Sequence, residues 1–359
     1  MRFFDGLAGY LVKKLFAKQV WFWLLIAALP VTAEAVRDLY SSQVPVADQS
    51  ESALSNASRS ALGEVMVKVS GHRDVLENPD VRAALGKARQ HVLQYAYARS
   101  KGEEKALEAR FEFDSNWVVE VLTTAGEPLW TANRPSVLVW MIAEDEDGRY
   151  FVNQDTSPEL ANLVLEEFGR RGVPVRLPLF DLTDAAALSP AQAWRLDGGA
   201  LKAASARYDV ENVIAGRMVA LSSGKATGDW SYFFGDDRSD RSFTATGAED
   251  FARRGASLVA ESMASRYAVA PTGSDPGGIT LSVQGVQRYS DYAGIVAWLE
   301  GLELVEHANL ERVGDDVIEI RLTASADPSQ LAKLFKLNQR LSPLPPHAPH
   351  IQMSYLWQN

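Results

Sequence analysis

Val137-Leu-Val-Trp-Met-Ile142 is a continuous apolar run in the middle of the chain. A strand that faces water on one side alternates apolar and polar residues, whereas a strand buried on both faces reads as one apolar run. The run is therefore predicted to be a buried central strand. Predicted helices and strands alternate from this run onward, which indicates an α/β unit over residues 136–270.

The preceding residues, 36–135, are predicted to form a smaller unit with the order β-α-α-β-β. Asn78-Pro79 opens the second of its two helices, because proline suits the first turn of a helix, and the apolar stripe of this helix runs from Val81 to Tyr95. Two alternating runs, Leu107 to Phe113 and Trp117 to Thr123, then predict a β-hairpin.

The last unit, residues 279–359, follows a Pro- and Gly-rich linker over residues 271–278. Its predicted order is β-α-β-β-α-β, and the Pro-rich stretch from Pro343 to Pro349 is interpreted as a connector to the last strand. This order indicates a ferredoxin-like split βαβ fold. The fold class predicted for the whole chain is α+β, with a signal peptide followed by these three units.

Residues 1–35 are predicted to be a signal peptide that is cleaved after its last residue. A basic region around Lys13–Lys18 precedes a short apolar run, Pro30 interrupts the run, and Ala33-Glu-Ala35 supplies a small-x-small cleavage pattern. The run is shorter than the about 20 apolar residues of a spanning helix. The leader therefore predicts a periplasmic protein, and an uncleaved inner-membrane anchor facing the periplasm is the alternative.

Composition excludes several classes of function. The 359 residues include no cysteine, so disulfides, thiolate metal sites, cysteine nucleophiles and lipoprotein anchoring are excluded. The 36 Lys and Arg are outnumbered by 46 Asp and Glu, which gives a formal net charge of −10. An acidic chain repels a phosphate backbone, which argues against a general nucleic-acid binder.

Several segments together resemble an uncharacterised proteobacterial family of exported proteins, catalogued as a domain of unknown function. The resemblance implies an envelope location and brings no established catalytic residue or ligand. The segments are Val44-Pro-Val-Ala-Asp-Gln-Ser50, Val65-Met-Val-Lys-Val-Ser-Gly71, Leu76-Glu-Asn-Pro79, Gln94-Tyr-Ala-Tyr97, Val137 to Trp140 and Asn212 to Gly216.

Residues 137–269 also resemble the α/β domains of TolB-type and flagellar-assembly envelope proteins. Ile214-Ala-Gly-Arg217 and Trp230-Ser-Tyr-Phe233 carry this second resemblance. It is a likeness of fold, and a fold by itself says little about function.

An aromatic and basic segment is the candidate partner surface. Trp230 and Tyr232 are predicted to share one face of a strand, close to Arg238 and Arg241. Aromatic residues and arginine are favoured in interface hot spots. Ordinary packing of these aromatic residues within a sheet is the alternative interpretation.

No catalytic, cofactor or metal site is predicted. Ser222-Ser-Gly-Lys225 lacks the companion motifs of serine acyltransferases. Ser70-Gly-His72-Arg-Asp74 is interpreted as a solvated loop, and His347 and His350 have no nearby third ligand for zinc.

The sequence therefore predicts a non-catalytic periplasmic interaction or assembly module with an envelope protein as its partner. A periplasmic hydrolase acting on peptidoglycan or peptides is the main alternative, because its carboxylates can lie far apart in sequence. A carrier of a small apolar ligand is the third, and it requires an enclosed apolar pocket of roughly 300 Å³ or more.

Overall fold

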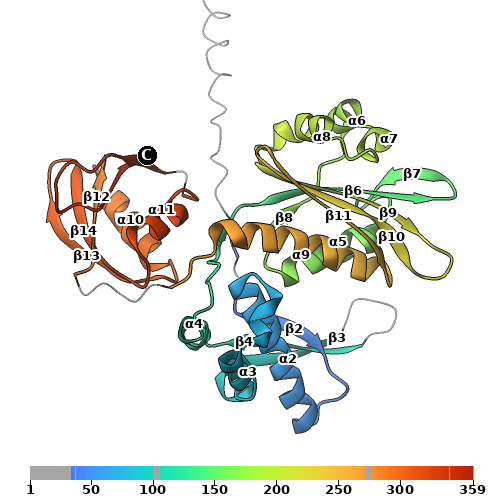
Figure 1. Ribbon diagram of the computed structural model, residues 1–359, viewed down its shortest axis with the longest axis horizontal. Helices are drawn as coiled ribbons and strands as arrows, with labels where there is room; N and C mark the ends of the chain where they lie inside the picture. Colours follow the sequence, from blue (N-terminus) through green and yellow to red (C-terminus); the bar gives the residue numbers. More distant parts are fainter. Residues whose placement is uncertain (1–33, 37, 100–105, 272–276, 339, 359) are drawn as a thin grey trace, which may run out of the picture. The chain divides into compact units, whose positions relative to one another are not determined.

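The computed structural model describes residues 34–36, 38–99, 106–271, 277–338 and 340–358. The described chain is a mixed α+β protein with four β-sheets, which confirms the predicted fold class (Figure 1). Each of the three larger sheets lies within one of the predicted ranges. The division into three domains itself stays a prediction.

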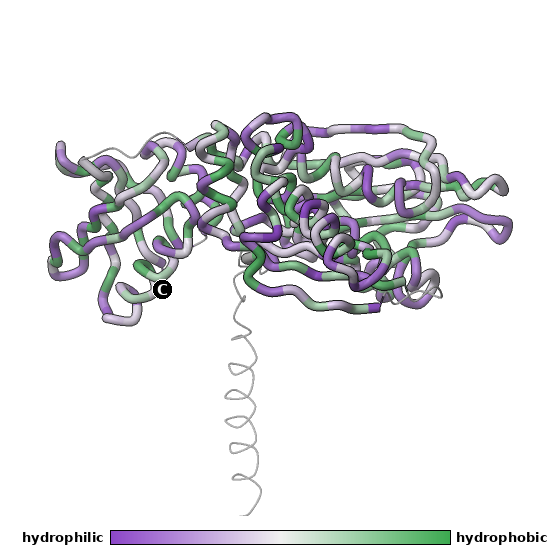
Figure 2. The backbone as a smooth tube through the Cα atoms, turned by 90° about the horizontal axis from the view of Figure 1, so that it is seen from below, coloured by the Kyte–Doolittle hydropathy of each residue, from purple (hydrophilic) through white to green (hydrophobic). Residues whose placement is uncertain are grey.

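The predicted leader lies outside the described residues except for its last two. The strand β1, Glu34–Ala35, pairs antiparallel with β5, Asn133–Arg134, so cleavage after Ala35 would remove this strand. Cleavage stays a prediction. No helix of the described chain is long and apolar enough to cross a membrane. Figure 2 accordingly shows hydrophobic and hydrophilic residues interspersed along the chain.

The largest sheet has six strands, and β6 lies at its centre. β6 pairs in parallel with both β8 and β9. The side chains from Val137 to Ala143 are all buried, as the apolar run predicts. The strands are β6 (Val137–Asp145), β7 (Gly148–Phe151), β8 (Val175–Arg176), β9 (Asn212–Ala220), β10 (Ala226–Phe234) and β11 (Asp237–Ala245).

Helices cover both faces of this sheet (Figure 1). Val139 of β6 belongs to a core cluster with side chains of α5 and α9. Its neighbour Trp140 belongs to a second cluster with side chains of α8, because successive residues of a strand point to opposite faces. The helices are α5 (Pro158–Arg170), α6 (Leu182–Ala187), α7 (Pro190–Ala193), α8 (Gly198–Ser205) and α9 (Ala248–Tyr267).

The described residues of the N-terminal part form a three-stranded sheet in the order β2-β4-β3 and three α-helices. Its elements are β2 (Ser41–Pro45), α2 (Glu51–Ser70), the 3₁₀ helix η1 (Arg73–Glu77), α3 (Pro79–Leu85), the 3₁₀ helix η2 (Ala88–His91), β3 (Val92–Arg99), β4 (Leu107–Phe113) and α4 (Ser115–Thr124).

Two predictions in this part are wrong. The expected hairpin strand from Trp117 to Thr123 is the helix α4, because the Asp114 side chain caps it and Val118 and Leu122 face the core one helical turn apart. The helix expected to reach Tyr95 ends at Leu85, and the residues from Val92 onward pair instead with β4.

The C-terminal part forms a five-stranded sheet in the order β13-β14-β12-β16-β15. β12 and β13 flank the antiparallel strand β14, as a split βαβ arrangement requires. The elements are β12 (Ile279–Gln284), α10 (Tyr289–Glu300), β13 (Val305–Val313), β14 (Val317–Ala324), α11 (Pro328–Phe335), β15 (Leu341–Leu344) and β16 (Met353–Trp357).

The predicted six-element order omits one strand of this sheet. The stretch interpreted as a connector begins within β15, and the last strand, β16, lies between β15 and β12 and runs parallel to β12. Pro343 is compatible with β15 because this strand is at the edge of the sheet, where one backbone N–H is not needed for pairing.

Candidate functional site

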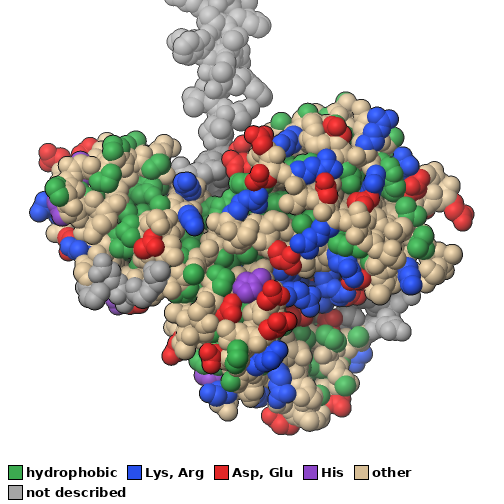
Figure 3. All heavy atoms as spheres, viewed as in Figure 1, with side chains coloured by type: hydrophobic (Ala, Val, Ile, Leu, Met, Phe, Trp, Pro, Cys, Tyr) green, Lys and Arg blue, Asp and Glu red, His purple; other side chains and the backbone are tan. Residues whose placement is uncertain are grey.

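A pocket of about 480 Å³ lies where α2, η1 and α3 face the end of α5 and the side of α9. Figure 3 shows Lys and Arg side chains gathered in this region on the face in view. Five of the twelve lining residues are arginines and two are glutamates, so we call it the arginine pocket. Its lining residues are Arg59, Ser60, Gly63, Glu64, Val67, Arg73, Leu76, Leu85, Glu167, Arg170, Arg171 and Arg253.

One face of α2 forms a wall of the pocket. Residues three and four apart lie on the same side of a helix, which brings Ser60, Gly63, Glu64 and Val67 together. The two smallest, Ser60 and Gly63, leave the hollow. A Cβ atom at Gly63 would touch only Leu76, at 3.7 Å, so the backbone there tolerates alanine.

The last turn of α5 and the residue that follows it contribute three charged residues. Glu167, Arg170 and Arg171 are spaced so that all three face the pocket. Gly172 follows the helix with φ of +65°, and a Cβ there would lie 2.5 Å from Nη1 of Arg134. This position therefore requires glycine.

Arg171 is the most unusual residue of the pocket. Its side chain is buried, with 7% of the residue exposed, and its Nη2 donates a hydrogen bond to the Gly71 carbonyl oxygen at 3.2 Å. Its Nε and Nη1 have no hydrogen-bond partner among the residues that the structure describes. Burial lowers the pKa of its guanidinium to about 10; Glu261 opposes this effect and Arg73 adds to it.

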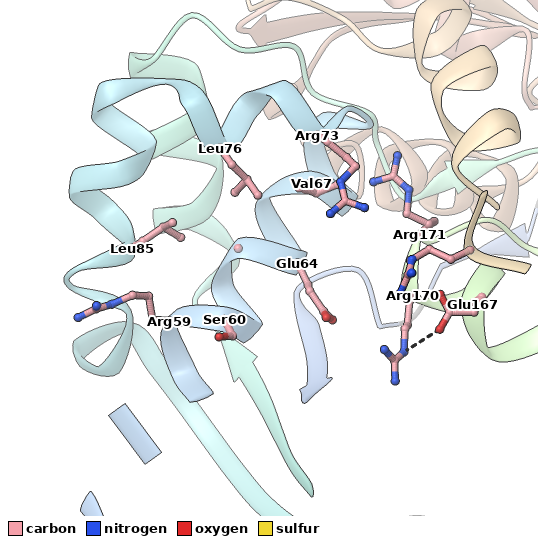
Figure 4. Close-up of a pocket in the computed structure, with 12 residues that line it drawn as sticks. Arg59, Ser60, Glu64, Val67, Arg73, Leu76, Leu85, Glu167, Arg170 and Arg171 are labelled. Atoms are coloured by element: carbon pink, nitrogen blue, oxygen red, sulfur yellow. Dashed lines mark ion pairs between the residues drawn. The ribbon is translucent and has the colours of Figure 1, made fainter. Parts of the chain in front are cut away.

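The other arginines divide into two kinds. Arg170 is paired with Glu166 at 3.3 Å and with Glu167 at 3.6 Å, and Arg253 is paired with Asp250 at 2.8 Å. Arg59 and Arg73 form no ion pair within the described part of the chain. In Figure 4 the guanidinium groups of Arg73 and Arg171 point into the same space, whereas that of Arg170 turns toward Glu167.

Glu167 is a carboxylate in the wall of a basic pocket. The residue is 3% exposed, and burial raises the pKa of its carboxyl group while Arg170 lowers it. The second carboxylate of the pocket, Glu64, accepts a hydrogen bond from the Ser42 hydroxyl. The carboxylates are outnumbered by guanidinium groups, which favours the binding of an anion.

Arg134 joins the two helices that carry most of the site. It is fully buried, and its guanidinium carbon lies over the ring of Trp130, 3.6 Å from the ring centre. Its Nη2 donates to the carbonyl oxygens of Lys68 and Trp130 at 2.9 and 2.6 Å, and its Nη1 donates to that of Gly172 at 2.9 Å. The ends of α2 and α5 are therefore tied together, because carbonyl groups at helix C-termini attract a cation.

The predicted surface of Trp230 and Tyr232 is wrong as an exposed face, because the two residues are 0% and 2% exposed. The Trp230 Nε1 donates to the Phe251 carbonyl oxygen of α9 at 3.0 Å, and the Tyr232 hydroxyl donates to Asn212 at 2.6 Å. A Cβ at Gly255 of α9 would lie 2.5 Å from the indole, so this glycine makes room for the ring.

The two arginines of the same prediction are exposed on β11. Arg238 pairs with Asp240 at 2.9 Å, and Arg241 pairs with Glu261 at 3.1 Å. Whether this strand binds a partner stays a prediction. The two arginines do not lie beside an exposed aromatic pair, because the face with Trp230 is covered.

The other motifs form no site in the described chain. Ser222 to Lys225 form an exposed turn between β9 and β10. His72 pairs with Glu127 at 3.2 Å, and His350 lies 3.4 Å from Glu319. The described residues contain no group of three or more potential metal ligands.

The arginine pocket was not predicted from the sequence. Its charged residues extend from Arg59 to Arg253 and follow no short motif. The one local signal is the pair Arg170-Arg171 at the end of an amphipathic helix, where basic residues are common for reasons unrelated to binding.

The comparisons with known proteins concern mainly the first part of the chain. Residues 33–131 match the model of a family described as a domain of unknown function (DUF8605). This match confirms the resemblance to an uncharacterised family over that range. The α2 wall of the pocket lies inside the matched residues, whereas the α5 and α9 arginines lie outside them.

No curated protein matches the chain. A crystal structure described as that of an uncharacterized protein matches 37% of this chain and 97% of its own, with 9% identity and a TM-score of 0.16. This similarity is too low to indicate a shared fold. The likeness of residues 137–269 to TolB-type and flagellar-assembly domains stays a prediction.

Proposed function

We propose that this chain is a non-catalytic interaction module of the bacterial cell envelope that binds an anionic group of its ligand or partner in the arginine pocket. The observation that carries the proposal is Arg171. A buried guanidinium with two unpartnered N–H groups is costly, because desolvation of a charge is offset only by a counter-charge and hydrogen bonds. An anion bound in the pocket supplies a counter-charge to this guanidinium.

The surrounding charges support the same ligand class. The pocket is basic although the whole chain has a formal net charge of −10. A concave site lined by one sign of charge concentrates ligands of the opposite sign. The pocket therefore attracts anions locally although the net charge of the chain is negative.

The envelope location rests on the leader sequence. Its basic region, short apolar run and Ala33-Glu-Ala35 pattern support export. We therefore place the pocket in the periplasm, and the absence of cysteine from the sequence means that folding there needs no disulfide.

The two alternative functions are less well supported by this geometry. The pocket exceeds the roughly 300 Å³ that a carrier of an apolar ligand needs, but its wall is charged. Its two carboxylates, Glu64 and Glu167, are each engaged by a neighbour, Ser42 and Arg170. A hydrolase site would need a pair free to act on a substrate.

Photo-crosslinking in intact cells tests the proposal. A photoreactive residue at Asn56, an exposed position one turn before the pocket on α2, reports on what binds there. We expect a specific adduct in the periplasmic fraction that Arg171→Met removes and Arg195→Gln retains. Arg195 is an exposed arginine outside the pocket, so its substitution controls for the change in charge. An adduct that persists in Arg171→Met, or a chain recovered only from the cytosol, would contradict the proposal.

A further inference from the structure

Resting on the proposed function, we infer that the anion is a phosphomonoester that carries an apolar group. The direction of the donors, the number of unpaired charges and the nature of the opposite wall point to this ligand class.

The donors of the pocket come from different elements. Arg73 belongs to η1, Arg171 to the end of α5 and Arg253 to α9. The groups of Arg73 and Arg171 approach one space from two sides (Figure 4). A planar carboxylate is matched by a single guanidinium fork, whereas the three terminal oxygens of a phosphoryl group accept donors from several directions.

The unpaired charge exceeds that of one carboxylate. Arg170 and Arg253 already have carboxylate partners, whereas Arg73 and Arg171, whose guanidinium groups point into one space, have no ion pair within the described residues. A phosphomonoester carries a charge of about −1.5 to −2 at neutral pH. It therefore neutralises this set more completely than a single carboxylate.

Part of the wall is apolar. Val67, Leu76 and Leu85 line the pocket together with the hollow at Gly63. A volume of about 480 Å³ leaves space beside a phosphoryl group. An attached hydrocarbon group fills that space and gains affinity by leaving water.

Isothermal titration of the full chain with three probes tests the inference. The probes are hexyl phosphate, hexanoate and inorganic phosphate, so one control lacks the phosphoryl group and the other lacks the apolar group. We expect hexyl phosphate to bind at least about tenfold more tightly than either control. Equal binding of hexanoate would overturn the inference and leave the proposed function in place. If none of the three probes binds, both the inference and the proposed function are contradicted.

Variants assign the two parts of the ligand. Gly63→Leu fills the hollow and is expected to reduce the affinity for hexyl phosphate to that for inorganic phosphate, whereas Gly63→Ala retains it. Arg73→Gln changes an exposed residue, so we expect folding to be preserved. It is expected to lower the affinity for hexyl phosphate and for inorganic phosphate by about fivefold or more. Unchanged binding in both Gly63→Leu and Arg73→Gln would show that the probes bind elsewhere and overturn the inference.

Binding to vesicles distinguishes two possible ligands with the same phosphomonoester group, a membrane lipid and a soluble molecule. Binding to phosphatidylcholine vesicles that contain phosphatidic acid, and not to phosphatidylcholine alone, would assign the ligand to a membrane headgroup. Binding of soluble hexyl phosphate without vesicle binding would assign it to a free phosphomonoester.

Discussion

We call the contacts of Arg134 with the ends of α2 and α5 the Arg134 junction. This junction and the arginine pocket each contain a buried arginine, Arg134 and Arg171, and the two arginines differ in what their N–H groups contact. Arg134 is fully buried, and its guanidinium bonds to backbone carbonyl oxygens on both helix ends. Arg171 is nearly as buried, but two of its nitrogens contact no acceptor among the described residues. Burial of a charge therefore does not identify a binding site. We propose that a buried arginine marks a binding site when some of its nitrogens have no partner and it lines a pocket.

The comparison predicts its largest effect at Arg134. Arg134→Met removes the hydrogen bonds of the Arg134 guanidinium to the ends of α2 and α5, and it leaves buried carbonyl groups without donors. We expect the free energy of unfolding to fall by about 3–5 kcal/mol. Urea unfolding followed by tryptophan fluorescence measures the loss. Arg195→Met, at an exposed position, should stay within about 0.5 kcal/mol of the wild type.

Lys68, whose carbonyl oxygen accepts a hydrogen bond from Arg134, is expected to make stability depend on pH. Burial lowers the pKa of its ammonium group from 10.5 to about 8, although its Nζ donates to the carbonyl oxygen of Ser41 at 2.7 Å. Between these two values the unfolded chain holds a proton that the folded chain lacks, so stability rises with pH.

We expect Lys68 to add about 2 kcal/mol to the free energy of unfolding between about pH 7.5 and about pH 9.5. Urea unfolding at the two pH values measures this change. Lys68→Met should lose that part of the increase, and an equal increase in the variant would show that other groups cause it.

Arg171→Met is expected to separate binding from stability. Methionine replaces a poorly compensated buried charge, so the free energy of unfolding should stay within about 1 kcal/mol of the wild type. The affinity for hexyl phosphate should fall at least about tenfold. If instead this variant unfolds as readily as Arg134→Met, the two arginines have the same structural role and the contrast between them is lost.

The smallest expected effect concerns Glu167, the carboxylate inside the pocket. Glu167→Gln removes a negative charge that competes with the ligand, so the affinity for hexyl phosphate should rise by about two- to fivefold. Glu166→Gln is the matched control, because Glu166 also pairs with Arg170 but does not line the pocket.

The same pair of proteins tests the pKa of Glu167. Burial raises this pKa, so the wild-type carboxyl group becomes neutral at a higher pH than an exposed glutamate does. The difference in affinity between wild type and Glu167→Gln should therefore shrink as the pH falls. A difference that stays constant down to about pH 4 would contradict the role assigned to this carboxyl group.

The local sequence was sufficient to predict secondary structure where one physical signal dominated. The apolar run from Val137 to Ile142 predicted a buried strand because both of its faces had to be covered. The local sequence was insufficient where the same residues were compatible with both a strand pattern and a helix pattern. Trp117 to Thr123 fits an alternating strand and also a helix with Val118 and Leu122 inward, and the Asp114 cap together with packing selected the helix.

The aromatic prediction failed for a related reason. Alternation placed Trp230 and Tyr232 on one face of a strand, but it does not say what covers that face. The helix α9 packs there, and Gly255 lets it approach the indole closely. Only the position of that helix shows that these side chains are core.

The order of most helices and strands, the acidic balance and the predicted leader follow from the sequence alone, because propensities, caps and periodicities act over a few residues. The arginine pocket was decided by tertiary structure. Arg73, Arg171 and Arg253 come from separate elements, and the tertiary structure, in which Arg134 joins the ends of α2 and α5, places them around one space. Charges distant in sequence acquire a common role when folding brings them together and removes water from one of them.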